Sequence, residues 1–253
     1  MPRHLLVFIA GVRAGVLTQS DTGLRYLTMR LAKMCGIPSE EVSYQEFCGQ
    51  PAVVITRYDR VVTKAGVRRI HQEDFCQALS VTPEKKYAED GGPSTPDVLH
   101  VLAKTSEPMR STASFAAMLF FNYLMGAPDA HAKNYSILYP RAGVSLLAPL
   151  YDVASGLPYD LTDRRPLRMA MSIGGENHLG FVDKTHVERF ADMAALEREA
   201  CLNLMANLCD RIVTFLPDAV AEAVEHGARG IDELASRLVP RVESHCRRTL
   251  QQL

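Results

Sequence analysis

A long apolar segment that ends abruptly at a proline constrains this chain more than any other feature. Residues 111–125 carry apolar side chains at helical spacing, and Gly126-Ala127-Pro128 follows them directly. Because proline lacks an amide hydrogen and has a fixed φ, the helix has to end here. The polar residues that come next, Asp129, His131 and Asn134, are therefore predicted to lie on a loop.

Two short β-rich runs follow this loop, at residues 135–139 and 144–150, and a turn-like Pro-Arg-Ala-Gly sequence separates them. In an antiparallel pair the start of the first strand lies beside the end of the second. This hairpin therefore predicts that Asn134 lies next to Asp152. An amide oxygen and a carboxylate together suit a hard cation such as Mg²⁺, which keeps waters and phosphate oxygens as its other ligands.

Asp129 is then left to orient a hydroxyl group and to accept its proton, which is the division of labour in kinase-type phosphoryl transfer. The plainer alternative is that Asp129 is a turn residue, since aspartate is common before strands. An Asp and an Asn five positions apart, with a second Asp one hairpin later, form a more specific pattern than Asp-x-His alone. His131 could bind a phosphate or simply hold the loop.

The remaining predicted elements place strands early and helices late. Other strands are expected at residues 4–10, 13–17, 42–47, 52–58 and 167–172. Helices are expected at residues 24–35, near 72–79 and 96–104, and from 185 onward with breaks at Pro217 and near 227–230. This order predicts an α+β chain with a small β-rich N-terminal lobe and a larger helical C-terminal lobe.

The composition is that of an ordinary globular protein of 253 residues, with 47% hydrophobic residues and a net charge of −1. This charge gives no reason to expect direct nucleic-acid or membrane binding. No run approaches the roughly 20 apolar residues of a membrane span. The six cysteines include no Cys-x-x-Cys pair, so we expect buried, reduced thiols in a cytoplasmic protein and no zinc site.

Several stretches in combination resemble the HipA family of bacterial serine/threonine kinases, which are toxins of toxin–antitoxin pairs. The resemblance covers roughly residues 26–240. It is carried by residues 26–33, 53–60, 71–79, 86–93, 121–134 and 151–155.

This resemblance implies a protein-kinase-like fold that uses ATP and Mg²⁺, with Asp129 as catalytic base and Asn134 and Asp152 as metal ligands. It implies that the backbone around Thr56 and Tyr58 holds adenine, with Gln72 and His131 near the nucleotide. It further implies a HipB-like helix-turn-helix antitoxin as partner, and an acceptor serine on a translation protein such as glutamyl-tRNA synthetase, an aminoacyl-tRNA synthetase. The implied divisions are a remnant N-terminal subdomain at 1–24, a partial N-lobe and hinge at 25–60, and a C-terminal kinase lobe at 61–253.

The chain also departs from the family pattern, because the N-terminal lobe looks truncated by an internal deletion. No Gly-x-Gly-x-x-Gly occurs, residues 1–32 contain no lysine, and Arg25 stands where an acidic residue is expected. The clamp on the transferred phosphate is therefore expected to be incomplete. Three interpretations remain open: an impaired protein kinase, a catalytically dead remnant that binds the antitoxin or another partner, and a small-molecule or lipid kinase with the same Asp-x4-Asn spacing.

Overall fold

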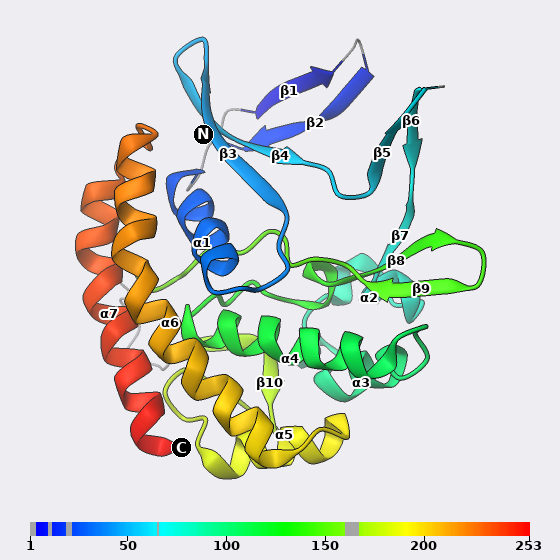
Figure 1. Cartoon of the computed structure of the whole chain (residues 1–253), viewed down its shortest axis with the longest axis vertical. Helices are drawn as coiled ribbons and strands as arrows, with labels where there is room; N and C mark the ends of the chain where they lie inside the picture. The colour runs from blue at the N-terminus through cyan, green and yellow to red at the C-terminus, as the bar shows by residue number, and fades with distance from the viewer. Residues whose placement is uncertain (1–3, 10–11, 19–21, 65, 160–166) are drawn as a thin grey trace.

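The computed structural model describes residues 4–9, 12–18, 22–64, 66–159 and 167–253. Small hairpins gather at one end of the molecule and most of the helices at the other (Figure 1). The strands are β1 (His4–Ile9), β2 (Val12–Thr18), β3 (Glu41–Phe47), β4 (Gln50–Thr56), β5 (Arg60–Thr63), β6 (Gly66–Arg69), β7 (His71–Asp74), β8 (Ser136–Arg141), β9 (Val144–Leu147), β10 (Arg168–Ile173) and β11 (Glu176–His178). The α-helices are α1 (Thr22–Met34), α2 (Phe75–Ala78), α3 (Thr95–Leu102), α4 (Pro108–Leu124), α5 (Lys184–Ala194), α6 (Arg198–Glu225) and α7 (Ile231–Gln252).

Each of these strands pairs with a neighbouring strand in the antiparallel direction, and the pairs form five separate sheets. Four hairpins, β1–β2, β3–β4, β5–β6 and β10–β11, stand as separate two-stranded sheets, and β7, β8 and β9 form a three-stranded sheet in that order. The predicted pairing of the two strands after the polar loop is confirmed, with Ile137 opposite Leu147. The α+β arrangement, with a small β-rich part and a larger helical part, is confirmed as well.

The central element is α4, the apolar helix predicted at residues 111–125 (Figure 1). Its Phe115, Phe120 and Phe121 side chains have no exposed surface. Fully burying one such aromatic side chain contributes about 1.5–3 kcal/mol. These buried side chains fix the helix in the core, and the polar loop at residues 126–134 follows its C-terminal end.

Helix α1 attaches the N-terminal part to the helical layer. The Tyr26 hydroxyl donates a hydrogen bond to Glu222 of α6 at 2.9 Å, and Arg30 forms an ion pair with the same carboxylate at 2.7 Å. Leu24, Leu27 and Leu31 are completely buried, which is the pattern predicted for residues 24–35. The position of α1 is therefore set by tertiary contacts along its whole length.

One prediction about the middle of the chain was wrong, and one hairpin there was not predicted. The segment near residues 72–79 is not one helix, because residues 71–74 pair with β8 and only Phe75–Ala78 forms a helical turn. Asp74 caps that turn by accepting from the Gln77 amide at 2.9 Å. The β5–β6 hairpin was missed, since its strands are exposed and show no apolar alternation.

The break expected at Pro217 is absent, and α6 continues through it. Leu216 and Ala219, on either side of it, are fully buried. Packing of these neighbours outweighs the roughly 3 kcal/mol that an internal proline costs a helix. The second break is confirmed, because α6 ends at Glu225 and α7 begins at Ile231.

Of the six cysteines, five are buried free thiols, and Cys48 lies exposed in the turn between β3 and β4. In the described part of the chain, no helix is both long enough and apolar enough to cross a bilayer.

Candidate phosphotransferase site

Two loops that are distant in sequence are fastened together directly after α4. The Gly156 amide donates to the Gly126 carbonyl at 2.8 Å, and the Ser155 hydroxyl donates to the Met125 carbonyl at 2.6 Å. Gly126 has a φ of +56°, and a Cβ there would lie 2.7 Å from the Leu157 side chain. Glycine is therefore needed at this point for the two loops to approach, and this approach sets the loop of Asp129 beside the loop of Asp152.

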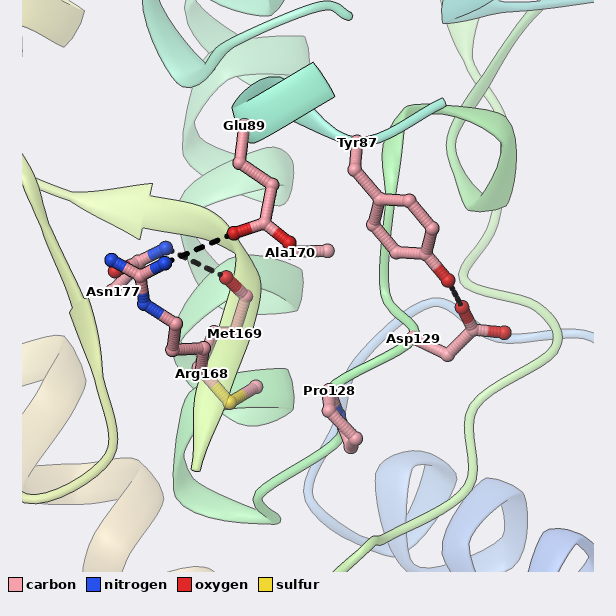
Figure 2. A pocket seen from close by; sticks show the side chains of 8 residues that line it. All are labelled: Tyr87, Glu89, Pro128, Asp129, Arg168, Met169, Ala170 and Asn177. Atoms are coloured by element: carbon pink, nitrogen blue, oxygen red, sulfur yellow. Dashed lines mark hydrogen bonds and ion pairs between the residues drawn. The ribbon is translucent and has the colours of Figure 1, made fainter. Parts of the chain in front are cut away.

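Asp129 presents an exposed carboxylate on a backbone that is firmly held. Its carbonyl accepts hydrogen bonds from the His131 amide and from the Asn134 side chain, both at 2.9 Å. Its side chain is 67% exposed. The Tyr87 hydroxyl donates a short hydrogen bond to the carboxylate (Figure 2). The Lys86 ammonium lies 3.6 Å from the same carboxylate oxygen.

Asn134 and Asp152 lie together, as the hairpin predicts. The Asn134 amide nitrogen donates to the carbonyl of Asp152 at 3.4 Å, in addition to its bond to Asp129. With the nitrogen engaged by two carbonyls, the amide oxygen is left as the ligand atom of this side chain. Asp152 has a φ of +58°, a left-handed conformation that non-glycine residues adopt mainly at functional or strained positions.

These donors fit Mg²⁺, since one amide oxygen and one carboxylate are a typical protein contribution when phosphates and waters complete the octahedron. Within the described ranges, no group of three or more His, Cys, Asp or Glu side chains is arranged to hold a metal ion. A cation bound between Asn134 and Asp152 would therefore depend on the phosphates of a nucleotide for its other ligands.

An arginine side chain, however, already contacts this carboxylate. The Arg25 guanidinium of α1 forms an ion pair with Asp152, and both side chains are 42% exposed. A divalent cation would have to displace Arg25 or share Asp152 with it. In the sequence, Arg25 stands where the family resemblance implies an acidic residue. The structure shows that its positive charge is paired with Asp152.

A buried carboxylic acid supports the Asp152 loop from the N-terminal side. The Asp152 amide donates to Glu40 at 3.4 Å, and the Glu40 amide donates to the Leu150 carbonyl at 2.9 Å. Burial raises the pKa of Glu40 to about 7; the hydrogen bond from the Asp152 amide opposes this shift, and the negative charge of Asp152 adds to it. Glu40 is thus a part of the site that no sequence pattern indicated.

Two of the residues expected near the nucleotide, Tyr58 and Gln72, contact residues next to the proposed metal ligands. Thr56 is exposed at the end of β4, and the Tyr58 ring lies 6.2 Å from that of Tyr151, the residue before Asp152. Burial raises the pKa of Tyr58, against the opposing effect of a hydrogen bond from the Gln72 side chain. Gln72 in turn donates to the Ser136 hydroxyl at 3.0 Å.

Tyr151 continues this network to the loop at residues 126–134. Its hydroxyl is hydrogen-bonded to Ser136 and donates to the Lys133 carbonyl at 2.7 Å. The predicted hinge residues are thereby connected, through side chains, to the loop that carries Asn134.

His131 is buried behind Asp129 and faces away from solvent. Its Nε2 lies 3.6 Å from the Asp129 carboxylate, and its ring meets the Tyr87 ring edge-on at 5.2 Å. Burial lowers the pKa of His131 and so favours the neutral imidazole. The negative charge of Asp129 opposes this shift. These contacts would hold the loop in place, and the position of His131 near a nucleotide stays a prediction.

A cavity of about 260 Å³ opens beside Asp129, and Figure 2 shows its lining. Tyr87 and Asp129 form one wall, and β10 forms the opposite one. Arg168 of β10 pairs with Glu89 at 3.1 Å across the rim. The space is large enough for one side chain of an approaching molecule, and it adjoins the carboxylate that is expected to receive a proton.

Two solved structures share the fold of this chain, which is protein-kinase-like. The structure of Shewanella oneidensis HipA with HipB and operator DNA aligns with a TM-score of 0.83 at 23% identity, over 99% of this chain and 64% of that one. The Helicobacter pylori proinflammatory kinase CtkA aligns with a TM-score of 0.57 at 13% identity, over 96% of this chain and 94% of that one. At these identities the likeness shows the fold.

The sequence identifies the family within that class. The family described as "HipA-like C-terminal domain" matches residues 15–216, and the chain belongs to it. The match crosses the expected divisions after residues 24 and 60, so the division into 1–24, 25–60 and 61–253 stays a prediction.

Two curated relatives are similar to this chain over about half of their own length. It is 41% identical to "Putative kinase Y4mE" of Sinorhizobium fredii over 198 residues, which are 78% of this chain and 44% of that protein. It is 29% identical to the serine/threonine-protein kinase toxin HipA of Shewanella oneidensis over 212 residues, 79% of this chain and 47% of the relative. The chain spans about half the length of the curated relatives it matches.

Proposed function

We propose that this chain transfers the γ-phosphoryl group of Mg-ATP to a serine or threonine hydroxyl of a protein, with Asp129 as the base. The observation that supports this most is the joint position of three side chains. Asp129 is exposed beside a cavity, and Asn134 of the same loop lies next to Asp152 of the adjoining loop. Membership in the HipA-like family supports the same activity.

In this mechanism Asp129 binds the acceptor hydroxyl, orients it and accepts its proton as the hydroxyl oxygen bonds to the γ-phosphorus, while the bond from that phosphorus to the β,γ-bridging oxygen breaks and ADP leaves. Asn134 and Asp152 would hold Mg²⁺, which when bound neutralises phosphate charge. The backbone around Thr56 and Tyr58 would hold adenine, with Gln72 beside it. Buried His131 would keep the loop and the Asp129 backbone in place.

A second candidate function follows from the ion pair between Arg25 and Asp152. If this arginine permanently blocks the metal position, the chain would be a binding module without catalytic activity. Its partner would then be a HipB-like helix-turn-helix antitoxin, since the similar HipA of Shewanella oneidensis was solved in complex with HipB and operator DNA.

Calorimetric titration with Mg-ATP separates the two candidates. The kinase proposal predicts saturable binding that weakens at least about tenfold in Asp152→Asn, because the metal loses its charged ligand. Lys133→Gln is unsuitable as a control, since Lys133 pairs with Asp74 of the neighbouring turn. Lys104→Gln is preferable, because Lys104 is an exposed lysine that follows α3. Absence of binding at millimolar Mg-ATP would refute the kinase proposal.

A further inference from the structure

A lysine from a distant loop lies directly beside the proposed base. The Lys86 ammonium is 3.6 Å from the Asp129 carboxylate and 4.9 Å from the centre of the Tyr87 ring. Its side chain is 33% exposed, so it is partly enclosed and still accessible. Burial alone would lower the pKa of Lys86, but hydrogen bonding to Tyr87 and the charge of Asp129 outweigh burial and raise it. Lys86 therefore carries a positive charge at neutral pH.

The loop that carries Lys86 is built to hold it in this position. The Gly92 amide donates to the Tyr87 carbonyl at 2.9 Å and closes the loop on itself. A Cβ at Gly92 would lie 2.0 Å from the Lys85 carbonyl oxygen, a distance that only glycine allows. At the far side, Glu89 pairs with Arg168 of β10 and anchors the loop to a strand. The ammonium is thus directed by a closed backbone and does not depend on a mobile side chain alone.

Phosphoryl transfer needs positive charge at the place where this ammonium lies. The hydroxyl that gives its proton to Asp129 is the same group that bonds to phosphorus, so the transferred phosphoryl must pass within a few ångströms of that carboxylate. His131, the other basic side chain next to Asp129, is buried, and its pKa is lowered. Of these two neighbours, Lys86 is the one suited to stabilise phosphate charge.

We propose that Lys86 is a further catalytic residue, whose ammonium contacts the phosphoryl group while it passes to the acceptor hydroxyl held by Asp129. It would supply part of the positive clamp for which the N-terminal sequence offers no lysine. This inference rests on the proposed kinase function. In the nucleotide-free chain Asp129 holds the ammonium, and the γ-phosphate becomes its second anionic partner when Mg-ATP is bound.

The test compares wild type with Lys86→Ala and Lys86→Arg, and uses Lys85→Ala as a matched control. Lys85 is the adjacent lysine of the same loop, and its side chain is exposed. Calorimetry measures the affinities for Mg-ATP and Mg-ADP, and transfer from labelled ATP to bacterial proteins gives kcat. Lys86→Ala should lower kcat about 10²–10³-fold and weaken Mg-ATP binding more than Mg-ADP binding. Lys86→Arg should restore most of both, and Lys85→Ala should match wild type.

The outcomes separate the inference from the function on which it rests. A wild-type chain that neither binds Mg-ATP nor transfers phosphate overturns both. A wild-type chain that transfers phosphate while Lys86→Ala is equally active overturns the role of Lys86 alone. Equal losses in the Ala and Arg variants, together with a lowered melting temperature, would mean a structural role and would also overturn it. A preference for ATP over ADP that disappears only in Lys86→Ala supports the inference even where transfer is slow.

Discussion

The Arg25 guanidinium of α1 forms an ion pair with the carboxylate of Asp152, the residue expected to bind Mg²⁺. This contact joins the N-terminal helix to the loop that also carries Tyr151 and Ser155. The carboxylate expected to bind the metal is therefore already paired with a cation of the chain itself, and a bound metal would displace this arginine or share the carboxylate with it.

Removing this competing charge should strengthen divalent-cation binding. We expect Arg25→Gln to raise the affinity of the ATP-bound chain for Mn²⁺ about two- to fivefold, because partly exposed ion pairs are worth up to about 1 kcal/mol. Titration followed by electron paramagnetic resonance measures the free metal. Lys33→Gln, a change of equal charge on the same helix, should leave the affinity unchanged. An affinity that is the same in wild type and in Arg25→Gln would mean that the arginine does not compete.

Substitution of Gly92, the glycine that closes the loop of Lys86, should lower both stability and activity. Gly92→Ala would drive a methyl group into the backbone oxygens of Lys85 and Tyr87. The loop must open, so we expect a loss of about 1–3 kcal/mol in unfolding free energy and a fall in transfer activity of at least about tenfold. Denaturant unfolding and the labelled-ATP assay measure the two effects.

Gly91→Asn provides the control within the same loop. Gly91 has a φ of +79° with open space around its Cβ position, and asparagine adopts this conformation more readily than other side chains. This variant should retain both stability and activity. If Gly92→Ala behaves in the same way, the closed loop is not what positions Lys86.

A buried histidine far from the site should make the fold sensitive to acid. Burial lowers the pKa of His245 to about 4, helped by Arg248 and opposed by a hydrogen bond to the Tyr123 backbone. In the unfolded chain the same group titrates near 6.5. Above that pH both states are neutral and the stabilisation is complete. As pH falls from 6.5 towards 4, only the unfolded chain takes up the proton, so about 3 kcal/mol is lost.

Denaturant unfolding at pH 7.5 and at pH 4.5 tests this linkage. Wild type should lose about 2–3 kcal/mol more between the two values than His245→Gln, which keeps a donor but does not titrate. Equal losses in the two chains would show that His245 does not carry the acid sensitivity.

The elements that the sequence predicted well are those whose own residues determine them. The helix at residues 111–125 and the hairpin that follows it depend on an apolar run, a proline stop and two β-rich segments. The segment at 72–79 failed because pairing with β8 decides its conformation. The β5–β6 hairpin was not predicted, because its apolar side chains are exposed and form no buried face: Val62 and Val67 are 83% and 65% exposed. Neither effect leaves a local pattern to read.

The site divides in the same way. Asp129, Asn134 and Asp152 lie within one loop and one hairpin, so their proximity could be predicted from strand pairing. Arg25 and Lys86 reach the two carboxylates from other parts of the chain. Residues 86–93 resemble the family, but resemblance alone gave them no role, and only the closed loop shows that Lys86 faces Asp129.

The most direct test of the central claim is transfer of label from γ-labelled ATP to heat-treated soluble bacterial proteins, by wild type and by Asp129→Asn. Mass spectrometry then locates the phosphate. The proposed function predicts phosphoserine or phosphothreonine with wild type, and a rate about 10²–10⁴-fold lower with the variant, while Mg-ATP binding is retained. Equal labelling by the two chains, or no labelling by wild type, would contradict it.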